Sequence, residues 1–525
     1  MTTRWMVCSG LMFLLAGPAQ AQPVDSLKTR AEATDFQETT RYEEVMDFTE
    51  VVANGSETIF RTVFGYTSEG RALPLVVVGD VAGAGAEAVR ASGKTRVFVQ
   101  ANIHAGEVCG KEAMLMLLRA LAAGQHAAWA DSLVLLIAPI YNADGNERIS
   151  LTNRPGQNGP LGGMGQRPNA QGLDLNRDHM KMDSPEARSL VGLFNAYDPH
   201  VVVDLHTTNG AIHAYHLTYS PPLHPNTPRA IDAFLRENWL PAVTRRIKER
   251  YGWEYYYYGN IPWRNSNAER GWYTFDHRPR FNNNYTGLRN RFAILSEAYA
   301  YATFEERVLA SLYFVEEILE FAYQNAGTIQ TITRRVDAES VVGQALAVRA
   351  QHARSSEPVE ILMGEVEEVK HPYADIRLRN RLDVKRSEQM YEYGRFEPTE
   401  TATAPRAYLV PPGLSTTIDR LDAHGIHARL LEADTTLLVE RFRLDSTQVA
   451  AREYQGHHAQ TLFGSYEQID LTLPAGTLVV PVEQPLGRLA FSLLEPRSDD
   501  GLAAWGLIET ADAEVYPVLR IPADR

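Results

Sequence analysis

Cysteine, basic charge and long apolar runs are all scarce in this sequence. The 525 residues include two cysteines, Cys8 and Cys109. Cys8 lies in an N-terminal segment that we expect to be removed, so the mature chain has no partner for an internal disulfide bond. The formal net charge of −14 argues against a nucleic acid partner, because phosphate binding needs a basic surface. After the first 21 residues no segment has the roughly 18 consecutive apolar residues of a membrane span.

The first 21 residues have the pattern of a secretory signal peptide. Arg4 lies in a short basic segment, an apolar run extends from Trp5 to Ala16, and Ala19-Gln20-Ala21 is typical of a cleavage site. We therefore expect a mature chain that begins near Gln22 and is secreted or periplasmic. Its composition, 44% hydrophobic and 22% charged, is that of an ordinary globular protein that buries a sizeable core.

Two regions with different patterns of apolar residues follow the signal peptide. Between residues 22 and 330, nearly all-apolar segments at 97–101, 133–140, 201–205 and 292–296 alternate with loops and helices. Such segments predict strands of a sheet that helices cover on both faces, with ligands beyond the carboxyl ends of the strands. From about residue 340 to 525, short alternating strands with turn signals predict a separate β-rich accessory domain. We place the boundary between Gly327 and Ser340.

A candidate metal site begins where the first apolar strand ends. His104-Ala105-Gly106-Glu107 lies at a corner between this strand and a helix, and a His and a Glu three residues apart can hold one zinc ion if a distant third ligand exists. The strand Val201–Leu205 delivers His206 as that ligand. Two His and one Glu leave one position open, which is the catalytic rather than the structural arrangement. Asp204 either orients His206 or binds a loop amide.

A zinc hydrolase also needs a base, and Glu297 is our candidate. It follows the apolar strand 292–296, so its carboxylate is expected in a partly desolvated place, which raises the pKa of a carboxyl group towards a useful range. The alternative is a glutamate that caps the end of a strand. Asn176 and Arg177, in the segment LDLNRD, are a candidate binding site for a carboxylate, because the guanidinium of Arg can bind a carboxylate through two hydrogen bonds. The alternative is a structural ion pair.

These motifs together resemble the carboxypeptidase A-like zinc metallocarboxypeptidases. HxGE, NADG at Asn142 to Gly145, LDLNRD, VDLHTT and the Glu after an apolar strand occur in the order and approximate spacing of that family, over roughly residues 40–325. The resemblance implies an α/β fold with a mixed, twisted, eight-stranded sheet between helices. It implies one Zn²⁺ bound by His104, Glu107 and His206, and Glu297 as general base and then acid. It also implies that Asn176 and Arg177 bind the terminal carboxylate of the substrate.

Other family features are matched less clearly. The family uses a mobile Tyr upstream of the catalytic Glu, for which Tyr273 is our candidate and Tyr285 the packing alternative. An Arg that stabilises the oxyanion is expected in the long loop 148–173, where Arg154 and Arg167 both remain candidates. Asp178 departs from the family pattern, which has Asn there more often, and an acid beside Arg177 could partly neutralise it.

The sequence therefore predicts an exported zinc metallocarboxypeptidase that hydrolyses the C-terminal amide bond of peptides with a free carboxylate. One alternative is a zinc amide hydrolase that acts on peptidoglycan stem peptides or N-acyl amino acids. Another is an inactive binding protein with the same fold. Arg278, Arg280 and Phe281 compete for the floor of the specificity pocket, so no side-chain preference can be chosen. The sequence indicates no oligomeric state.

Overall fold

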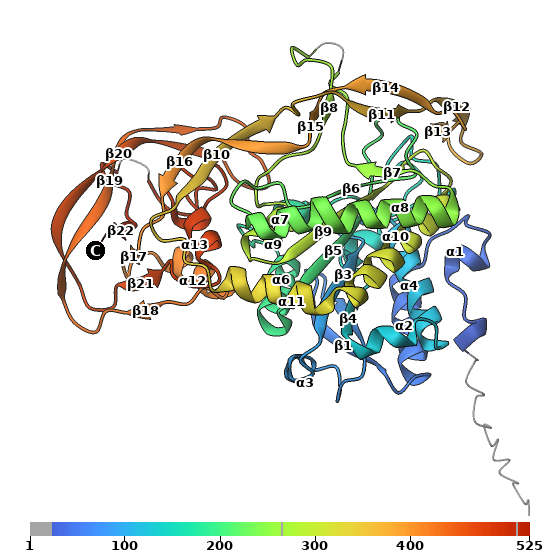
Figure 1. Cartoon of the computed structure of the whole chain (residues 1–525), viewed down its shortest axis with the longest axis horizontal. Helices are drawn as coiled ribbons and strands as arrows, with labels where there is room; N and C mark the ends of the chain where they lie inside the picture. The colour runs from blue at the N-terminus through green and yellow to red at the C-terminus, as the bar shows by residue number, and fades with distance from the viewer. Residues whose placement is uncertain (1–23, 264–265, 511–512, 525) are drawn as a thin grey trace, which may run out of the picture.

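The computed structural model describes residues 24–263, 266–510 and 513–524 of the chain (Figure 1). The predicted signal peptide lies outside these ranges. Within them, no helix combines the length and the apolar character that a membrane crossing requires.

An eight-stranded mixed sheet forms the centre of the N-terminal region, as the resemblance implied. Its order is β1-β2-β4-β3-β5-β9-β6-β7, and the four predicted apolar strands are the adjacent β4, β3, β5 and β9. These four run parallel, whereas β1, β2 and β6 join by antiparallel pairs. The strands are β1 (Ile59–Tyr66), β2 (Ala72–Val78), β3 (Thr95–Ala101), β4 (Leu133–Ala138), β5 (Val201–Thr207), β6 (Leu217–Ser220), β7 (Tyr255–Tyr257) and β9 (Phe292–Ala298).

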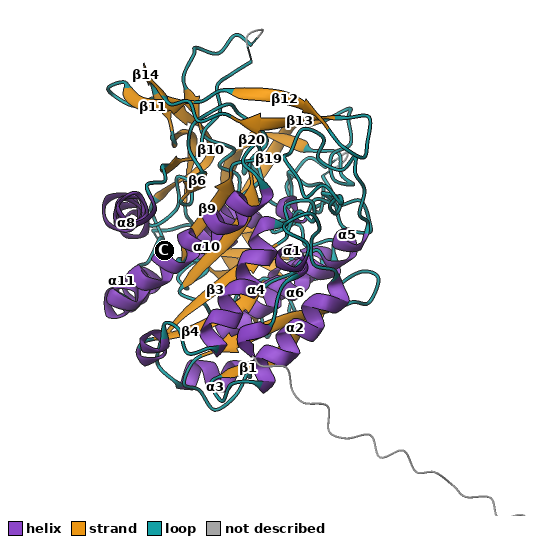
Figure 2. Ribbon diagram, turned by 90° about the vertical axis from the view of Figure 1, so that its right-hand side faces the viewer, coloured by secondary structure: helices purple, strands orange, loops and turns teal. Residues whose placement is uncertain are grey.

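Helices cover both faces of this sheet (Figure 2). Gly110 of α4 lies against Leu205, whereas Phe194 of α6 packs edge-on against Phe98. Phe98 pairs with Val202, and residues of even and odd number in β5 point to opposite faces, so α4 and α6 lie on opposite sides. The helices are α1 (Arg30–Ala33), α2 (Tyr42–Asn54), α3 (Ala86–Ala91), α4 (Cys109–Ala122), α5 (Ala143–Glu147), α6 (Pro185–Tyr197), α7 (Arg229–Phe234), α8 (Leu240–Tyr251), α9 (Asn282–Leu288), α10 (Phe304–Gln324) and α11 (Ala326–Asp337).

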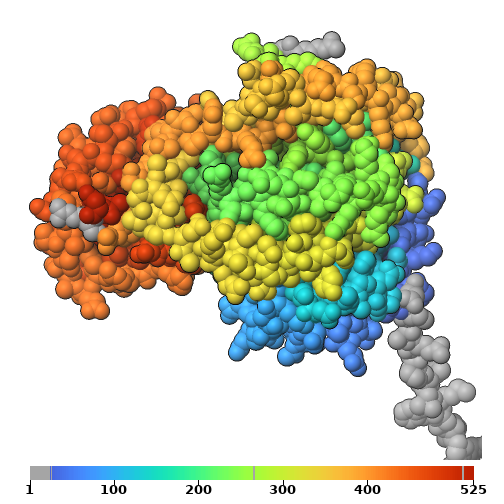
Figure 3. Space-filling view, in the orientation of Figure 1, coloured from blue at the N-terminus to red at the C-terminus, as the bar shows by residue number. Residues whose placement is uncertain are grey.

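The C-terminal region is rich in strands, as predicted, and abuts the N-terminal region (Figure 3). The predicted boundary at 327–340 is largely occupied by α11, and a single buried cluster of hydrophobic residues contains members from both regions. The division into two domains therefore stays a prediction. The elements are β10 (Ala345–Ala353), β11 (Val359–Met363), β12 (Val366–Lys370), β13 (Arg377–Arg381), β14 (Arg386–Met390), β15 (Glu392–Tyr393), β16 (Arg395–Thr403), β17 (Ala407–Val410), α12 (Ser415–Ala423), β18 (Arg429–Leu430), β19 (Thr435–Val449), β20 (Gln460–Leu473), β21 (Leu478–Pro481), α13 (Gly487–Leu494) and β22 (Leu519–Ile521).

Strands β19 and β20 form a long hairpin at the edge of a six-stranded sheet of order β18-β21-β17-β22-β19-β20. We call the connection between them, residues 450–459, the hairpin tip. Within it Tyr454 and His457 exchange two backbone hydrogen bonds around Gln455 and Gly456, whose φ angles are 52° and 80°. Two consecutive left-handed residues are typical of a type I′ turn. The two regions also meet where β15 of the C-terminal region pairs in parallel with β8 (Trp272–Tyr273) of the N-terminal region.

Candidate active site

The three predicted metal ligands come together at the carboxyl ends of β3 and β5. One donor atom from each of His104, Glu107 and His206 lies within 4.8 Å of the others. The Nδ1 atoms of the two imidazoles are 3.3 Å apart, and they lie 3.1 Å and 3.0 Å from the two carboxylate oxygens of Glu107. All three side chains are buried. Because β3 and β5 are neighbours, the sheet itself brings residues 104 and 206 together.

Local backbone geometry aims His104 and Glu107 at the same point. After β3 the chain turns at Asn102, whose φ is 67°, and the Glu107 N–H then donates to the His104 carbonyl over 2.9 Å. Gly106 lies between the two ligands, where a Cβ atom would come within 2.8 Å of the Gly165 carbonyl oxygen and of the Arg154 side chain. The corner therefore needs glycine at this position, because the long loop packs directly on its backbone.

A carboxylate contacts the far nitrogen of each imidazole. Asp174 lies 3.0 Å from His104 Nε2, and Asp204 lies 2.9 Å from His206 Nε2. Gln100 in turn donates to Asp204 over 3.1 Å. Carboxylates in these positions accept the Nε2–H and leave each Nδ1 lone pair for a metal. Of the two alternatives for Asp204, the structure shows the contact with His206. Asp174 had no such assignment from the sequence.

This donor set fits Zn²⁺. Two imidazole nitrogens and one carboxylate, with their outer carboxylate partners in place, form the ligand set of a zinc site that keeps one position open. No other group of three His, Cys, Asp or Glu side chains within the described ranges converges in this way.

Glu297 lies opposite His206, on the neighbouring strand β9. Its Oε2 is buried and has no hydrogen-bond partner among the described residues, so it faces space that a water molecule or substrate can fill. Burial is the main reason that the pKa of Glu297 is raised to about 8, and the Glu107 carboxylate adds to the effect, whereas His206 and the two nearby arginines oppose it. A carboxyl group with such a pKa can both take and return a proton near neutral pH.

Arg154 and Arg167 both reach the site, but in different ways. Arg154 donates to Glu107 Oε1 over 2.6 Å, to Gln157, and to the carbonyls of Thr207 and Thr208. Every nitrogen of its guanidinium therefore has a protein acceptor. Arg167 binds Asp174 through Nε and Nη2, and its Nη1 has no closer acceptor than Glu107 Oε1, 3.8 Å away. Among the described residues, only Arg167 of this pair has a guanidinium nitrogen, Nη1, with no hydrogen-bond partner.

Asn176 and Arg177 lie on a short 3-10 helix, η3 (Leu175–Arg177), beside the metal ligands. Asn176 Oδ1 accepts from the Asn282 N–H over 2.9 Å. The Arg177 guanidinium lies 3.8 Å from the centre of the Phe281 ring and donates through Nη1 to the Asn176 carbonyl. No hydrogen bond or ion pair joins the side chains of Asp178 and Arg177 in the described part of the chain. Asp178 is buried, forms an ion pair of 2.5 Å with Lys181, and accepts hydrogen bonds from Ser184, so it does not neutralise its neighbour directly.

The structure does not bring Tyr273 to this site. Its ring stacks on Tyr393 at 3.9 Å, its hydroxyl donates to the Glu269 carbonyl, and it does not line the cavity around the metal ligands. Its role in substrate binding stays a prediction that this arrangement does not support. Tyr285, the packing alternative, is fully buried and bonds His424.

Tyr258 lines the cavity, although sequence reasoning did not select it. Its hydroxyl accepts from Asn260, and burial together with the nearby Glu297 carboxylate raises its pKa. A run of four tyrosines, 255–258, was the available signal, but only the fold decides which member faces the site.

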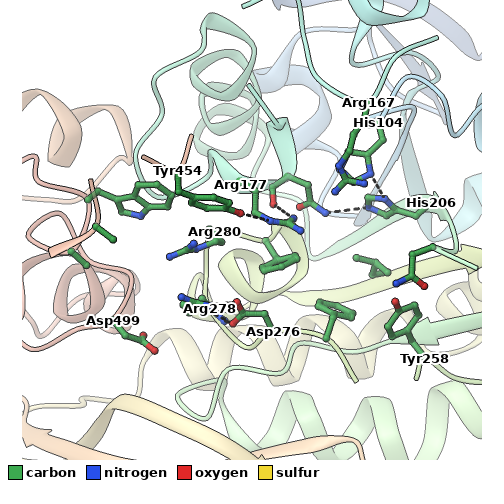
Figure 4. A pocket seen from close by; sticks show the side chains of 18 of the residues that line it. His104, Arg167, Arg177, His206, Tyr258, Asp276, Arg278, Arg280, Tyr454 and Asp499 are labelled. Carbon is green, nitrogen blue, oxygen red and sulfur yellow. Dashed lines mark hydrogen bonds and ion pairs between the residues drawn. The ribbon is translucent and has the colours of Figure 1, made fainter. Parts of the chain in front are cut away.

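A cavity of about 850 Å³ joins these residues to the C-terminal region (Figure 4). It begins at the metal ligands and continues past Arg177 to the hairpin tip. The walls from the C-terminal region are Arg349, Ala450, Arg452, Tyr454, Ala459, Gln460, Thr461, Asp499, Ala504 and Trp505. No motif in the sequence pointed to these residues. Arg278 and Arg280, predicted near the pocket floor, also line it, but they are paired with Asp276 and Asp500.

Comparisons with known proteins show which family part of this chain matches. The family model of zinc carboxypeptidases matches residues 45–275, a range that contains the three ligands, Asn176 and Arg177 and ends before Glu297. "Carboxypeptidase 2" of Trichophyton tonsurans is 25% identical over 452 residues, which cover 82% of this chain and 77% of that protein. The relative of the same name from Trichophyton rubrum is 25% identical over 453 residues, with the same coverage.

Among solved structures, carboxypeptidase A from Helicoverpa armigera matches with a TM-score of 0.42 and 17% identity, over 57% of this chain and 78% of that one. A putative carboxypeptidase A from Shewanella denitrificans matches with a TM-score of 0.41 and 19% identity, over 55% of this chain and 69% of that one. The family model and the curated relatives, together with the His–Glu–His cluster, show that residues 45–275 carry a zinc carboxypeptidase domain and that the protein is a zinc metallopeptidase.

Proposed function

We propose that the protein is an exported carboxypeptidase that hydrolyses the C-terminal amide bond of peptides with a free terminal carboxylate. The observation that carries this proposal is the place of Arg177, which lines the same cavity as the metal ligands and Glu297. One cavity therefore holds both a cationic anchor for a carboxylate and the groups that amide hydrolysis requires. Export rests on the signal-peptide pattern of residues 1–21.

His104, Glu107 and His206 would hold the zinc ion. When bound, zinc polarises the scissile carbonyl and lowers the pKa of a coordinated water. The protein's part in this chemistry is to orient the ligands. Asp174 and Asp204 fix the two imidazoles, and Glu107 is held further by the Thr207 N–H over 3.0 Å.

Glu297 would act on protons at its unpartnered Oε2. It takes a proton from the attacking water as the C–O bond forms, and it delivers that proton to the amide nitrogen as the C–N bond breaks. Burial stabilises the protonated carboxyl between these steps, which suits a group that must carry a proton from one atom to another.

Arg167 would stabilise the charge that develops on the carbonyl oxygen. Its Nη1 has no hydrogen-bond partner among the described residues, whereas all the nitrogens of Arg154 are bonded to the protein. A donor that is already in place when the oxyanion forms needs no reorganisation. We assign Arg154 the structural role of holding Glu107 and the end of β5.

Asn176 and Arg177 would hold the terminal carboxylate. Phe281 supports one face of the guanidinium, and the Asn176 carbonyl fixes one edge. A planar guanidinium that is held in this way can bind a carboxylate through two parallel hydrogen bonds.

Mass spectrometry of peptide cleavage tests the proposal. The protein is incubated with matched peptides that differ only in a free or an amidated C-terminus. We expect single residues to be released from the free acid, and the amide to react at least about tenfold more slowly because it lacks the charge that Arg177 binds. Equal rates on both peptides, or cleavage at internal bonds, would refute exopeptidase action.

Edman sequencing of the exported protein tests cleavage near Gln22.

A further inference from the structure

We propose that Tyr454, in the hairpin tip, is a substrate-binding residue that holds the terminal carboxylate together with Arg177. This inference rests on the proposed function, and it extends the binding site to a segment that lies far along the chain from LDLNRD. Figure 4 shows Tyr454 and Arg177 joined by a hydrogen bond at the wall of the cavity.

The contacts of Arg177 leave part of its guanidinium available. Nε donates to the Tyr454 hydroxyl over 3.1 Å, Nη1 donates to the Asn176 carbonyl over 2.7 Å, and the ring of Phe281 covers one face. Nη2 has no hydrogen-bond partner among the described residues. The guanidinium is thus fixed in orientation while donors remain free for an anion in the cavity.

The Tyr454 hydroxyl has a free donor beside that anion position. A phenol accepts hydrogen bonds and donates one, and Tyr454 accepts from Arg177. In the part of the chain that the structure describes, no acceptor is found for its own hydrogen. The side chain is 41% exposed and lines the cavity, so the O–H can turn towards a ligand. We expect the Tyr454 O–H to donate to a carboxylate that Arg177 binds, because hydrogen bonds to ionised acceptors are stronger than those to neutral ones.

The hairpin tip is held firmly against the segment that carries Arg177. The Asp174 N–H donates to the Gln455 side chain over 2.8 Å, and His457 Nε2 lies 2.7 Å from Asp183. The Tyr454 ring stacks on Trp505 with an angle of 22° between the planes. These contacts fix Tyr454 before a ligand binds, which reduces the entropy that binding must overcome.

Two other tyrosines lie near the site, but no hydrogen bond joins either of them to Arg177 in the described part of the chain. The hydroxyl of Tyr273 bonds the Glu269 carbonyl outside the cavity, and that of Tyr258 bonds Asn260 near Glu297. Within the described ranges, Tyr454 is the tyrosine whose hydroxyl bonds Arg177. The C-terminal region is therefore a part of the substrate-binding site and not only an appendage.

Binding measurements on a catalytically inactive background test this proposal. Isothermal titration calorimetry compares Glu297→Gln with the double variant Glu297→Gln/Tyr454→Phe, using a free-acid peptide and its matched amide. We expect Tyr454→Phe to weaken binding of the free acid about tenfold, as expected for one hydrogen bond to a charged group, and to leave binding of the amide unchanged. The control is Tyr373→Phe, a tyrosine that is 68% exposed and does not line the cavity.

A third substitution separates contact with the substrate from support of Arg177. In the background Glu297→Gln/Arg177→Met, the direct contact predicts that Tyr454→Phe still weakens free-acid binding. If the effect disappears there, Tyr454 only positions Arg177 and the proposal is overturned. Unchanged free-acid binding in the first comparison also overturns it, while the proposed function stands. If Glu297→Gln itself binds acid and amide equally, the handle at Arg177 is absent and both proposals fall.

Discussion

His206 and Glu297 lie directly opposite each other on the parallel strands β5 and β9. Residues that pair in this way point to the same face of a sheet, and adjacent strands lie about 4.8 Å apart. The backbone ladder therefore sets the separation between a metal ligand and the proposed base. A rigid sheet is a better support for such a pair than two loops, because its hydrogen bonds restrict small displacements.

Replacing Glu297 by Gln is expected to lower kcat by about 10²- to 10⁴-fold, since the amide cannot accept the proton of water. Glu297 is not one of the metal ligands, so zinc content measured by atomic emission should stay at that of the wild type. If activity stayed within tenfold of the wild type, Glu297 would not be the base. A loss of zinc would instead make it part of the metal site.

Replacing Asp204 by Asn is expected to weaken zinc binding about 10- to 100-fold, because the His206 Nε2–H loses its charged acceptor. Competition with a chromogenic chelator measures the affinity. Asp470→Asn is the matched control, since Asp470 is exposed on β20, far from the ligands in sequence and sheet. Equal zinc affinity of the two variants would show that Asp204 has no role in orienting the ligand.

The two arginines of the long loop are expected to respond differently to substitution. Arg167→Met should lower kcat about 10²-fold with little change in KM, because it removes a donor that acts on the transition state. Arg154→Met should lower the melting temperature instead, because it leaves the Thr207 and Thr208 carbonyls without their donor. A larger loss of kcat for Arg154→Met at unchanged melting temperature would reverse the two assignments.

Asp178→Asn is expected to destabilise the fold and to leave the preference for free-acid peptides unchanged. The substitution removes the charge that pairs with buried Lys181, although Asp183 remains 2.9 Å from the same ammonium group. We expect a loss of about 2 kcal/mol in the free energy of unfolding, less than for a buried pair without a second partner. Denaturant titration measures the loss. A changed ratio of rates on acid and amide would mean that Asp178 does influence Arg177.

Acid should destabilise the protein through buried neutral histidines, of which His424 is a clear case. Burial lowers the pKa of His424 to about 3. The neutral ring donates from Nε2 to the Met180 carbonyl over 3.1 Å and accepts at Nδ1 from the Tyr285 hydroxyl over 2.8 Å. The unfolded histidine has a pKa of about 6.5, so below that pH the unfolded state binds a proton that the folded state does not. Stability is fully present above pH 6.5 and falls by up to about 1.4 kcal/mol per pH unit below it.

The variant His424→Gln isolates this contribution. Unfolding free energies of wild type and variant are measured at several pH values between 7.5 and 5.5, with zinc at the same saturating concentration. As the pH falls, the unfolding free energy of the wild type should decrease more steeply than that of the variant, by the slope that corresponds to the uptake of about one proton on unfolding. Parallel curves would show that His424 does not remain neutral in the folded protein.

Much of the sheet could be predicted from the sequence because its central strands are buried on both faces. Strands β3, β4, β5 and β9 read as continuous apolar runs, and each was expected within a few residues of where it lies. The metal ligands were predictable for a related reason. They stand where such strands end, and the carboxyl ends of adjacent parallel strands meet at one edge.

What the sequence alone determined is the set of candidate groups: the three ligands and Glu297, which follow apolar strands, and the pair Asn176 and Arg177 in the segment LDLNRD. Only the tertiary structure decided which side chains surround that chemistry. Asp178 follows Arg177 in the chain yet pairs with Lys181, and Tyr454 lies far away in sequence yet bonds Arg177. The physical reason is that strand order and burial are written in local patterns, whereas the direction of a loop side chain depends on packing between distant segments.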